Sequence, residues 1–141
     1  MKVIEFIKKI AAKSSNRTTI DAQQHSIVDK INEGLLELAN ITTPLNLRVK
    51  YTEGYIYRRL SKTRGLRKPK EVKTLYNDID LDKDLLDALA YNIIAKLEPQ
   101  RGAYYRGMMM KQITYYEQRL IEYEDVDREE TLNDWQEQFG G

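Results

Sequence analysis

Two amphipathic helices separated by one short break constrain the fold of this chain more than any other feature. On both sides of residues 98–102, apolar residues recur at steps of three and four, which places them on one face of each helix. In the first helix, residues 81–97, they are Leu85, Leu86, Leu89, Ile93, Ile94 and Leu97. In the second, residues 103–125, they are Tyr105, Met109, Ile113, Tyr116, Leu120 and Tyr123. Because Pro99 ends the first helix and the link is short, the pattern predicts an antiparallel hairpin with a shared core.

Two further helices are expected before this hairpin. The apolar face of a short N-terminal helix consists of Val3, Phe6, Ile7 and Ile10. The next helix is expected to run from a cap at Asp21 to about Asn40, with Val28, Ile31, Leu35 and Leu38 facing inward. Gly34 lies in the middle of that helix, where glycine costs about 1 kcal/mol relative to alanine. A glycine retained at such a position indicates close packing.

Between the helix pairs the hydrophobic period changes from helical spacing to alternation. Residues 45–52 alternate strictly, which predicts a half-buried strand, and residues 55–60 read as the returning strand of a hairpin after a turn at Glu53 and Gly54. A polar basic loop is expected at residues 61–70 and a third short strand at residues 72–76. The predicted fold class is mainly α, a small bundle of about four helices with a short β-hairpin insertion. The expected organisation is one domain over residues 1–125, with the insertion at about 45–76, followed by an acidic C-terminal tail at 126–141.

The composition argues against catalysis and metal binding. The chain of 141 residues suffices for one core, contains no cysteine and has a single histidine, His25, which we interpret as an ordinary surface or capping residue. No G-x-S-x-G segment and no glycine-rich phosphate loop occurs. The carboxylates at Asp78, Asp80, Asp82 and Asp84 can hold a hard cation or favour a helix start, and we prefer the second interpretation. We expect no enzyme, no cofactor, no metal site and no membrane span.

Charge is unevenly distributed although the formal net charge is only +1. Residues 48–73 contain ten basic and two acidic residues, whereas residues 114–141 contain nine acidic and two basic residues. This asymmetry suits head-to-tail pairing of copies of the chain, and it equally suits a solvated surface with no partner.

The basic segment and the tail supply the candidate contact residues. We select seven cations for contact with a partner or with DNA: Arg58, Arg59, Lys62, Arg64, Arg67, Lys68 and Lys70. They can neutralise phosphates while nearby tyrosines stack on bases, or the tyrosines can be a buried strand face and the cations can meet an acidic protein. In the tail, Trp135 and Phe139 are candidate interface anchors, with a disordered tail as the alternative.

The order of these elements resembles the head-to-tail connector (adaptor) proteins of tailed bacteriophages. The resemblance rests on IVDKINEGLLELA at residues 27–39, LDALAYNIIAKL at 86–97 and AYYRGMMMKQITYYEQRLIEY at 103–123, and it covers roughly residues 1–125. It implies a structural virion protein that forms a homo-oligomeric ring, usually dodecameric, at the neck between capsid and tail after assembly in the host cytoplasm. The implied partners are the portal protein, tail or neck proteins and the packaged DNA that passes through the channel. The alternative is a small nucleic-acid-binding or regulatory helical protein that uses residues 58–73.

Overall fold

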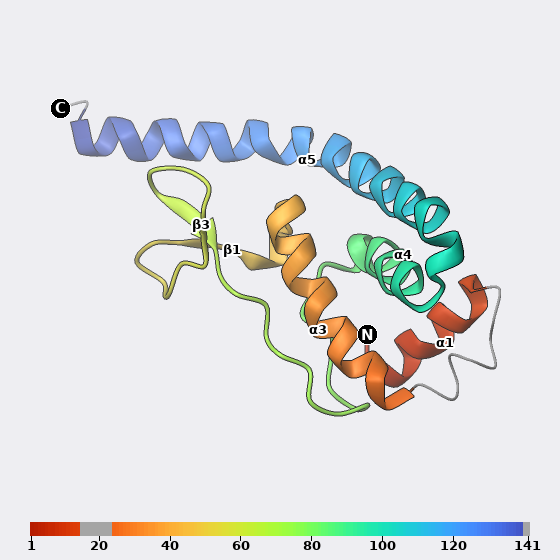
Figure 1. Cartoon of the computed structure of the whole chain (residues 1–141). Coiled ribbons are helices and arrows are strands. Elements are labelled where there is room, and N and C mark those ends of the chain that lie inside the picture. The colour runs from red at the N-terminus through yellow and green to blue at the C-terminus, as the bar shows by residue number, and fades with distance from the viewer. Residues whose placement is uncertain (15–23, 140–141) are drawn as a thin grey trace.

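The computed structural model describes the backbone of residues 1–14 and 24–139, and the side chains of residues 1–14 and 26–120 (Figure 1). The helices are α1 (Val3–Lys13), α3 (Gln24–Ile41), α4 (Leu86–Leu97) and α5 (Gly102–Phe139). Short 3₁₀ turns are η1 (Leu45–Leu47), η2 (Lys83–Leu85) and η3 (Pro99–Arg101), and the strands are β1 (Arg48–Lys50), β2 (Arg58–Arg59) and β3 (Arg64–Leu66). The predicted fold class is confirmed: the described chain is a helical bundle with a small antiparallel β insertion.

Helix α4 is the centre of the core. It contacts α1, α3 and α5, and eight of its residues are buried: Leu86, Ala88, Leu89, Ala90, Asn92, Ile93, Ile94 and Ala95. After η3 the chain turns back along α4 as α5, which confirms the predicted helical hairpin. Over the described side chains, the α5 face that meets this core is the predicted one, with Tyr105, Met109, Ile113, Tyr116 and Leu120 all buried. The side chain of Tyr123 lies outside the described residues.

Helix α3 approaches α4 closely at Gly34, as the mid-helix glycine predicted. A Cβ atom at Gly34 would lie 2.7 Å from Leu89 Cδ1 and 2.9 Å from Asn92 Oδ1, closer than real Cβ atoms come to their neighbours. On the same interface Asn92 Nδ2 donates to Glu37 Oε2 at 2.7 Å, and Lys96 Nζ lies 2.8 Å from Glu37 Oε1. The glycine therefore permits the close contact between α3 and α4, and the hydrogen bond and ion pair made by Glu37 stabilise the edge of this interface.

The sheet differs from the predicted hairpin in which strands pair. The strand order is β1-β3-β2, so β3 lies between the two strands that the alternation paired directly with each other. Register places Arg48 and Arg58 opposite Leu66, and Val49 and Arg59 opposite Gly65. The expected loop at residues 61–70 therefore contains the central strand. A Cβ at Gly65 would lie 2.8 Å from the Arg58 carbonyl oxygen and 2.6 Å from Ile56 Cγ2, so this strand depends on a glycine rather than on alternating apolar residues.

The prediction of a third strand at residues 72–76 is also wrong. Lys73 N and Thr74 N both donate to Asn77 Oδ1 at 2.9 Å, which makes a turn there. The residues around this turn instead hold the N-terminus: Ile4 N donates to the Leu75 carbonyl at 2.9 Å. Ile79 N donates to the Met1 carbonyl at 2.9 Å, so the segment behaves as a partner for residues 1–4 and fixes the start of α1.

Two helix ends differ from expectation. Helix α4 begins at Leu86, after the 3₁₀ turn η2, instead of near Leu81. Helix α5 continues to Phe139 instead of ending near Asp125, because residues 108–139 contain neither glycine nor proline and are rich in good helix formers. Helix α3 is described from Gln24, so the cap expected at Asp21 lies outside the described residues. The same holds for the side chain of His25.

We predict that Gly34→Ala destabilises the protein by about 1–2 kcal/mol, because crowding against Leu89 and Asn92 exceeds the gain of about 1 kcal/mol in helix propensity. The matched control is Gly107→Ala in α5, where a Cβ meets nothing within 4 Å. That control is expected to stabilise the protein slightly. Urea unfolding followed by circular dichroism measures both; equal effects of the two substitutions would contradict the close α3–α4 contact.

Candidate functional site

The seven cations selected from the basic segment divide into those that hold the fold and those that remain exposed. Arg58 belongs to the first group. Its Nη1 donates to the Ala39 carbonyl at 2.8 Å and to the Thr42 carbonyl at 3.0 Å. These carbonyls are at the C-terminal end of α3, where backbone oxygens lack helical partners and a cation is favourable. Arg58 therefore joins β2 to α3 and is engaged inside the protein.

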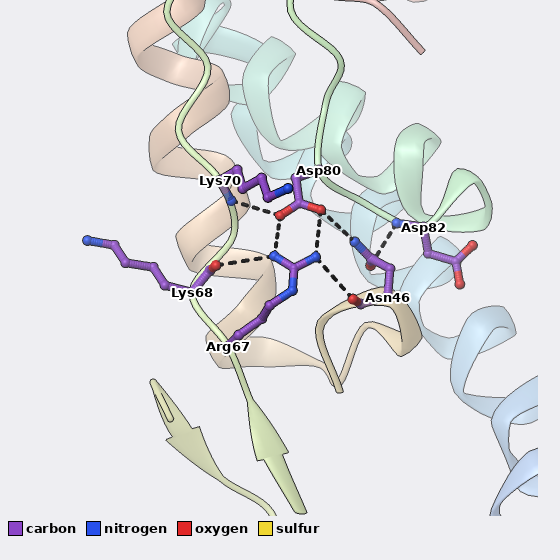
Figure 2. Close-up of polar contacts among 6 residues, drawn as sticks. All are labelled: Asn46, Arg67, Lys68, Lys70, Asp80 and Asp82. Carbon is purple, nitrogen blue, oxygen red and sulfur yellow. Dashed lines mark hydrogen bonds and ion pairs between the residues drawn. The ribbon is translucent and has the colours of Figure 1, made fainter. Parts of the chain in front are cut away.

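Arg67 is engaged in the same way, by the carboxylate of Asp80 (Figure 2). Nη1 lies 2.5 Å from Oδ2 and Nη2 lies 2.9 Å from Oδ1, which is the paired geometry in which arginine binds a carboxylate most strongly. Nη2 also donates to the Asn46 carbonyl at 3.2 Å and Nη1 to the Lys68 carbonyl at 3.4 Å. This arginine ties the end of β3 to the segment that precedes α4.

Asp80 collects further donors on both oxygens. The backbone N–H of Lys70 donates to Oδ2 at 2.8 Å, and Asn46 Nδ2 donates to Oδ1 at 3.2 Å. Burial opposes ionisation of Asp80, but the hydrogen bonds from Arg67 and Lys70 and the charges of both residues outweigh it and hold its pKa below the usual range. The side chain is only 15% exposed, so the pair is sheltered from much of the solvent screening that weakens surface pairs.

Asp82 extends this cluster to α5. Its backbone N–H donates to Asn46 Oδ1 at 2.9 Å, and its Oδ1 accepts from the N–H of Asp84 at 3.1 Å, which caps η2. The buried hydroxyl of Tyr116 donates to Asp82 Oδ2 at 3.0 Å and accepts from the Leu45 N–H at 2.9 Å. Burial, with the charge of Asp82, raises the pKa of Tyr116 well above its usual range. The cluster thus connects the insertion, the segment before α4 and α5 through five side chains: Asn46, Arg67, Asp80, Asp82 and Tyr116.

These contacts decide the role of the aspartate run. Asp82 caps η2 and so supplies the predicted helix-start charge, whereas Asp80 binds Arg67, Asn46 and the Lys70 N–H and has a different structural role. Within residues 1–14 and 26–120, where side chains are described, no group of three or more His, Cys, Asp or Glu side chains is arranged to hold a metal ion.

The remaining cations of the segment are exposed or nearly so. Arg59, Lys62, Lys68 and Lys70 are exposed, and Arg64 is half-buried in β3. The Arg59 guanidinium lies 5.5 Å from the centre of the Tyr51 ring, and the Tyr51 hydroxyl donates to the Ser61 carbonyl. Tyr55 is 84% exposed at the same end of the insertion. The arrangement offers scattered positive charge and an exposed ring, which suits weak, sequence-independent contact with a polyanion.

Two hollows flank the insertion in the described part of the chain. One, of about 310 Å³, lies between α3 and residues 68–71. The other, of about 510 Å³, lies between the end of α3, Arg58 of β2 and residues 114–120 of α5. Neither brings together the nucleophile, base and orienting group that catalysis needs.

The two tail anchors, Trp135 and Phe139, lie in the last turns of α5, and their side chains are outside the described residues. Figure 1 shows this end of α5 projecting beyond the other helices. Their interface role therefore stays a prediction.

Comparisons of the chain with protein-family models, with curated proteins and with solved structures find no match. Among the helices of the described residues, none combines the length and the apolar character required to cross a bilayer. The function has to be argued from the residues themselves.

We predict that Asp80→Asn lowers the free energy of unfolding at pH 7 by about 1–3 kcal/mol, because Arg67 loses its charged partner in a sheltered position. A folded-state pKa below the unfolded value of about 4 gives stability that is present above pH 4 and is lost as the pH falls through the folded-state pKa. The difference between variant and wild type should therefore shrink as the pH is lowered below about 4.

Urea midpoints measured at pH 7, 5, 4 and 3 provide the measurement. Asp78→Asn is the control, because Asp78 is an exposed aspartate two residues away. If both variants behave alike at every pH, the Arg67–Asp80 pair contributes nothing particular to stability.

Proposed function

We propose that this chain is a head-to-tail connector of a tailed bacteriophage, a subunit of a ring that lies below the portal and extends the DNA exit channel. The observation that carries the proposal is the order of the elements. A helix pair, α1 and α3, is followed by a β insertion and then by the α4–α5 hairpin. This is the order on which the resemblance to connector proteins rests, and the helical fold is compatible with it.

In this role the bundle is a rigid body and the insertion is its contact arm. A ring subunit has to keep its shape while DNA and partner proteins press on it. The apolar core around α4 and the polar cluster at Asp80 supply that rigidity. The portal protein above, and tail or neck proteins below, meet the two ends of the ring.

The distribution of cations favours DNA passage over tight DNA binding. Arg58 and Arg67 are engaged within the protein, which leaves Arg59, Lys62 and Lys68 among the exposed cations of the insertion. Each phosphate contact adds to salt-dependent affinity, so the engagement of Arg58 and Arg67 lowers the number of contacts that the insertion can make with DNA. Loose, sequence-independent contact is what a channel for moving DNA requires.

A second candidate function is a small nucleic-acid-binding or regulatory protein. The observation in its favour is the combination of the exposed Tyr55 ring with Arg59 and Lys62, because aromatic rings and cations together bind single strands. This candidate predicts measurable affinity in the purified chain alone, which the connector does not need.

We expect gold-labelled antibody against the chain to mark the neck of purified virions in electron micrographs, and the chain to appear in blots of the same particles. The physical reason is that a connector stays in the mature particle between capsid and tail. Antibody against a capsid protein is the control for labelling elsewhere on the particle. A chain absent from virions would reject the connector and leave the second candidate.

We predict that the triple variant Arg59→Gln/Lys62→Gln/Lys68→Gln reduces phage titre at least about tenfold while the protein stays folded, because these cations face a partner or DNA. The control triple Lys8→Gln/Lys83→Gln/Lys111→Gln removes the same charge from exposed sites outside the insertion. Titre by plaque assay and helicity by circular dichroism are the measurements.

The same variants separate the two candidates. For a nucleic-acid-binding protein, the purified wild type binds duplex or single-stranded DNA with an affinity that falls steeply as the salt concentration rises. The insertion triple loses up to about three phosphate contacts, so its affinity falls less steeply with salt. For a connector, binding by the isolated wild type is weak and the titre alone responds. Equal titres for both triples would contradict a role for the insertion in the virion.

A further inference from the structure

A groove beside α3 has a wall that is fixed at both ends. The wall is residues 68–71, and its first end is held by the pair of Arg67 with Asp80 and by the bond from Lys70 N to the same carboxylate. Its other end is held by Asn32 of α3, which donates from Nδ2 to the Val72 carbonyl at 2.8 Å and accepts the Val72 N–H at 2.7 Å. The wall cannot close onto α3 without loss of these bonds, so the groove is already formed before any ligand arrives.

The lining of this groove combines an apolar base with a cationic rim. Leu35 and Pro69 are buried and Leu36 is half-buried, whereas two lysines, Lys68 and Lys70, and one carboxylate, Glu71, are exposed at the edge and leave the rim with a net positive charge. The hollow of about 310 Å³ is larger than the roughly 150 Å³ cavity that takes a benzene ring. An apolar side chain carried on an acidic segment is the ligand that matches this lining.

The chain carries such a segment at its own C-terminal end. Trp135, the sole tryptophan, lies between Asp134 and Glu137, and Phe139 follows four residues later. Because α5 is helical through Phe139, the two aromatic residues are about one helical turn apart. The segment therefore presents large apolar side chains together with negative charge.

The groove of the same molecule is out of reach for this segment. Helix α5 is continuous over 38 residues, about 57 Å at 1.5 Å per residue. Figure 1 shows its C-terminal end projecting away from α3 and from the chain that leads from β3 to α4. A continuous helix has to break before its end can fold back, so the end of α5 is more readily bound by another molecule.

We propose that the groove between α3 and residues 68–71 binds the Trp135–Phe139 end of α5 from a second copy of the chain. The contact is head to tail, since groove and tail are different surfaces, and such contacts close into a ring when the rotation between copies allows it. The inference rests on the proposed connector function, because it assigns the subunit contact of that ring.

Cysteine cross-linking tests the contact in the full chain, which has no cysteine of its own. Glu71→Cys places a thiol on the groove wall without loss of a rim cation, and Gln138→Cys places one beside the tail anchors. After mild oxidation of the mixed variants, we expect at least several-fold more cross-linked heterodimer than with the control mixture of Asp29→Cys and Gln138→Cys. Asp29 is exposed on α3, outside the groove. Equal yields in the two mixtures overturn the proposal.

A non-covalent measurement tests the charge part of the proposal. Emission of the sole tryptophan reports on residue 135, and we expect it to shift to shorter wavelength as the full chain self-associates with rising concentration. Lys68→Glu should raise the midpoint of this shift about tenfold, while Lys8→Glu, an exposed substitution in α1, should leave it unchanged. Adding Asp134→Lys and Glu137→Lys to the Lys68→Glu chain should restore the midpoint at least in part. A midpoint that ignores Lys68→Glu overturns the proposal.

The two hypotheses fail in different ways. Label at the virion neck with no groove-specific cross-link rejects the groove contact and leaves the connector in place. A groove-specific cross-link in a chain that is absent from virions rejects the connector and leaves the self-association.

Discussion

Burial of α4 on three sides is the constraint on which the rest of the structure depends. A helix that contacts α1, α3 and α5 at once has little surface left for polar side chains, and most of its residues are therefore apolar and small or medium in size. Each fully buried leucine or isoleucine contributes about 1.5–3 kcal/mol relative to exposure, so α4 supplies much of the driving force for folding. The charged residues that α4 does place at interfaces are paired: Asp87 with Lys9 of α1, and Lys96 with Glu37 of α3.

The β insertion, by contrast, cannot stand on its own core. Its buried residues are Leu47 and Leu66, which cluster with Ala39 of α3 and have Tyr57 and Leu60 packed against them, and its strands are two or three residues long. So few apolar contacts do not stabilise an isolated sheet in water. The insertion is held instead by polar bonds to the bundle: Arg58 on the end of α3, Arg67 on Asp80, and Tyr116 on Leu45. This explains why a segment so rich in arginine uses the side chains of Arg58 and Arg67 to attach itself to the bundle.

The helices could be predicted from the sequence and the sheet only in part, for a physical reason. Helical spacing is a local pattern that repeats over several turns, so the inward faces at Ile31, Leu35 and Leu38 and at Met109 and Ile113 are legible without a structure. Strand pairing is not local. Arg64, Gly65 and Leu66 form the central strand because neighbours on both sides fit against Gly65, and neither neighbour is visible in that three-residue sequence.

The candidate cations show the same limit. Charge density marks the segment correctly as basic, but it does not distinguish Arg67 from its neighbour Lys68. The distinction comes from Asp80, thirteen residues further along, and from Asn46 in η1, whose carbonyl accepts from Arg67. The run of aspartates predicts negative charge at a helix start, and Asp82 has that role at η2. The pairing of Asp80 with Arg67 could be found only in the folded chain.

Asp80 also links the exposed cations of the insertion to the groove beside α3. Its carboxylate holds Arg67, which ends β3 and thereby positions the exposed cations of the insertion, and it holds Lys70 N, which fixes the wall of the groove beside α3. A displacement of residues 67–70 therefore alters the insertion and the groove together, since both are attached to one side chain with its charge held by surrounding donors. In the ring that we propose, the insertion and the groove share this one anchor, so a subunit that loses the geometry of one also loses that of the other.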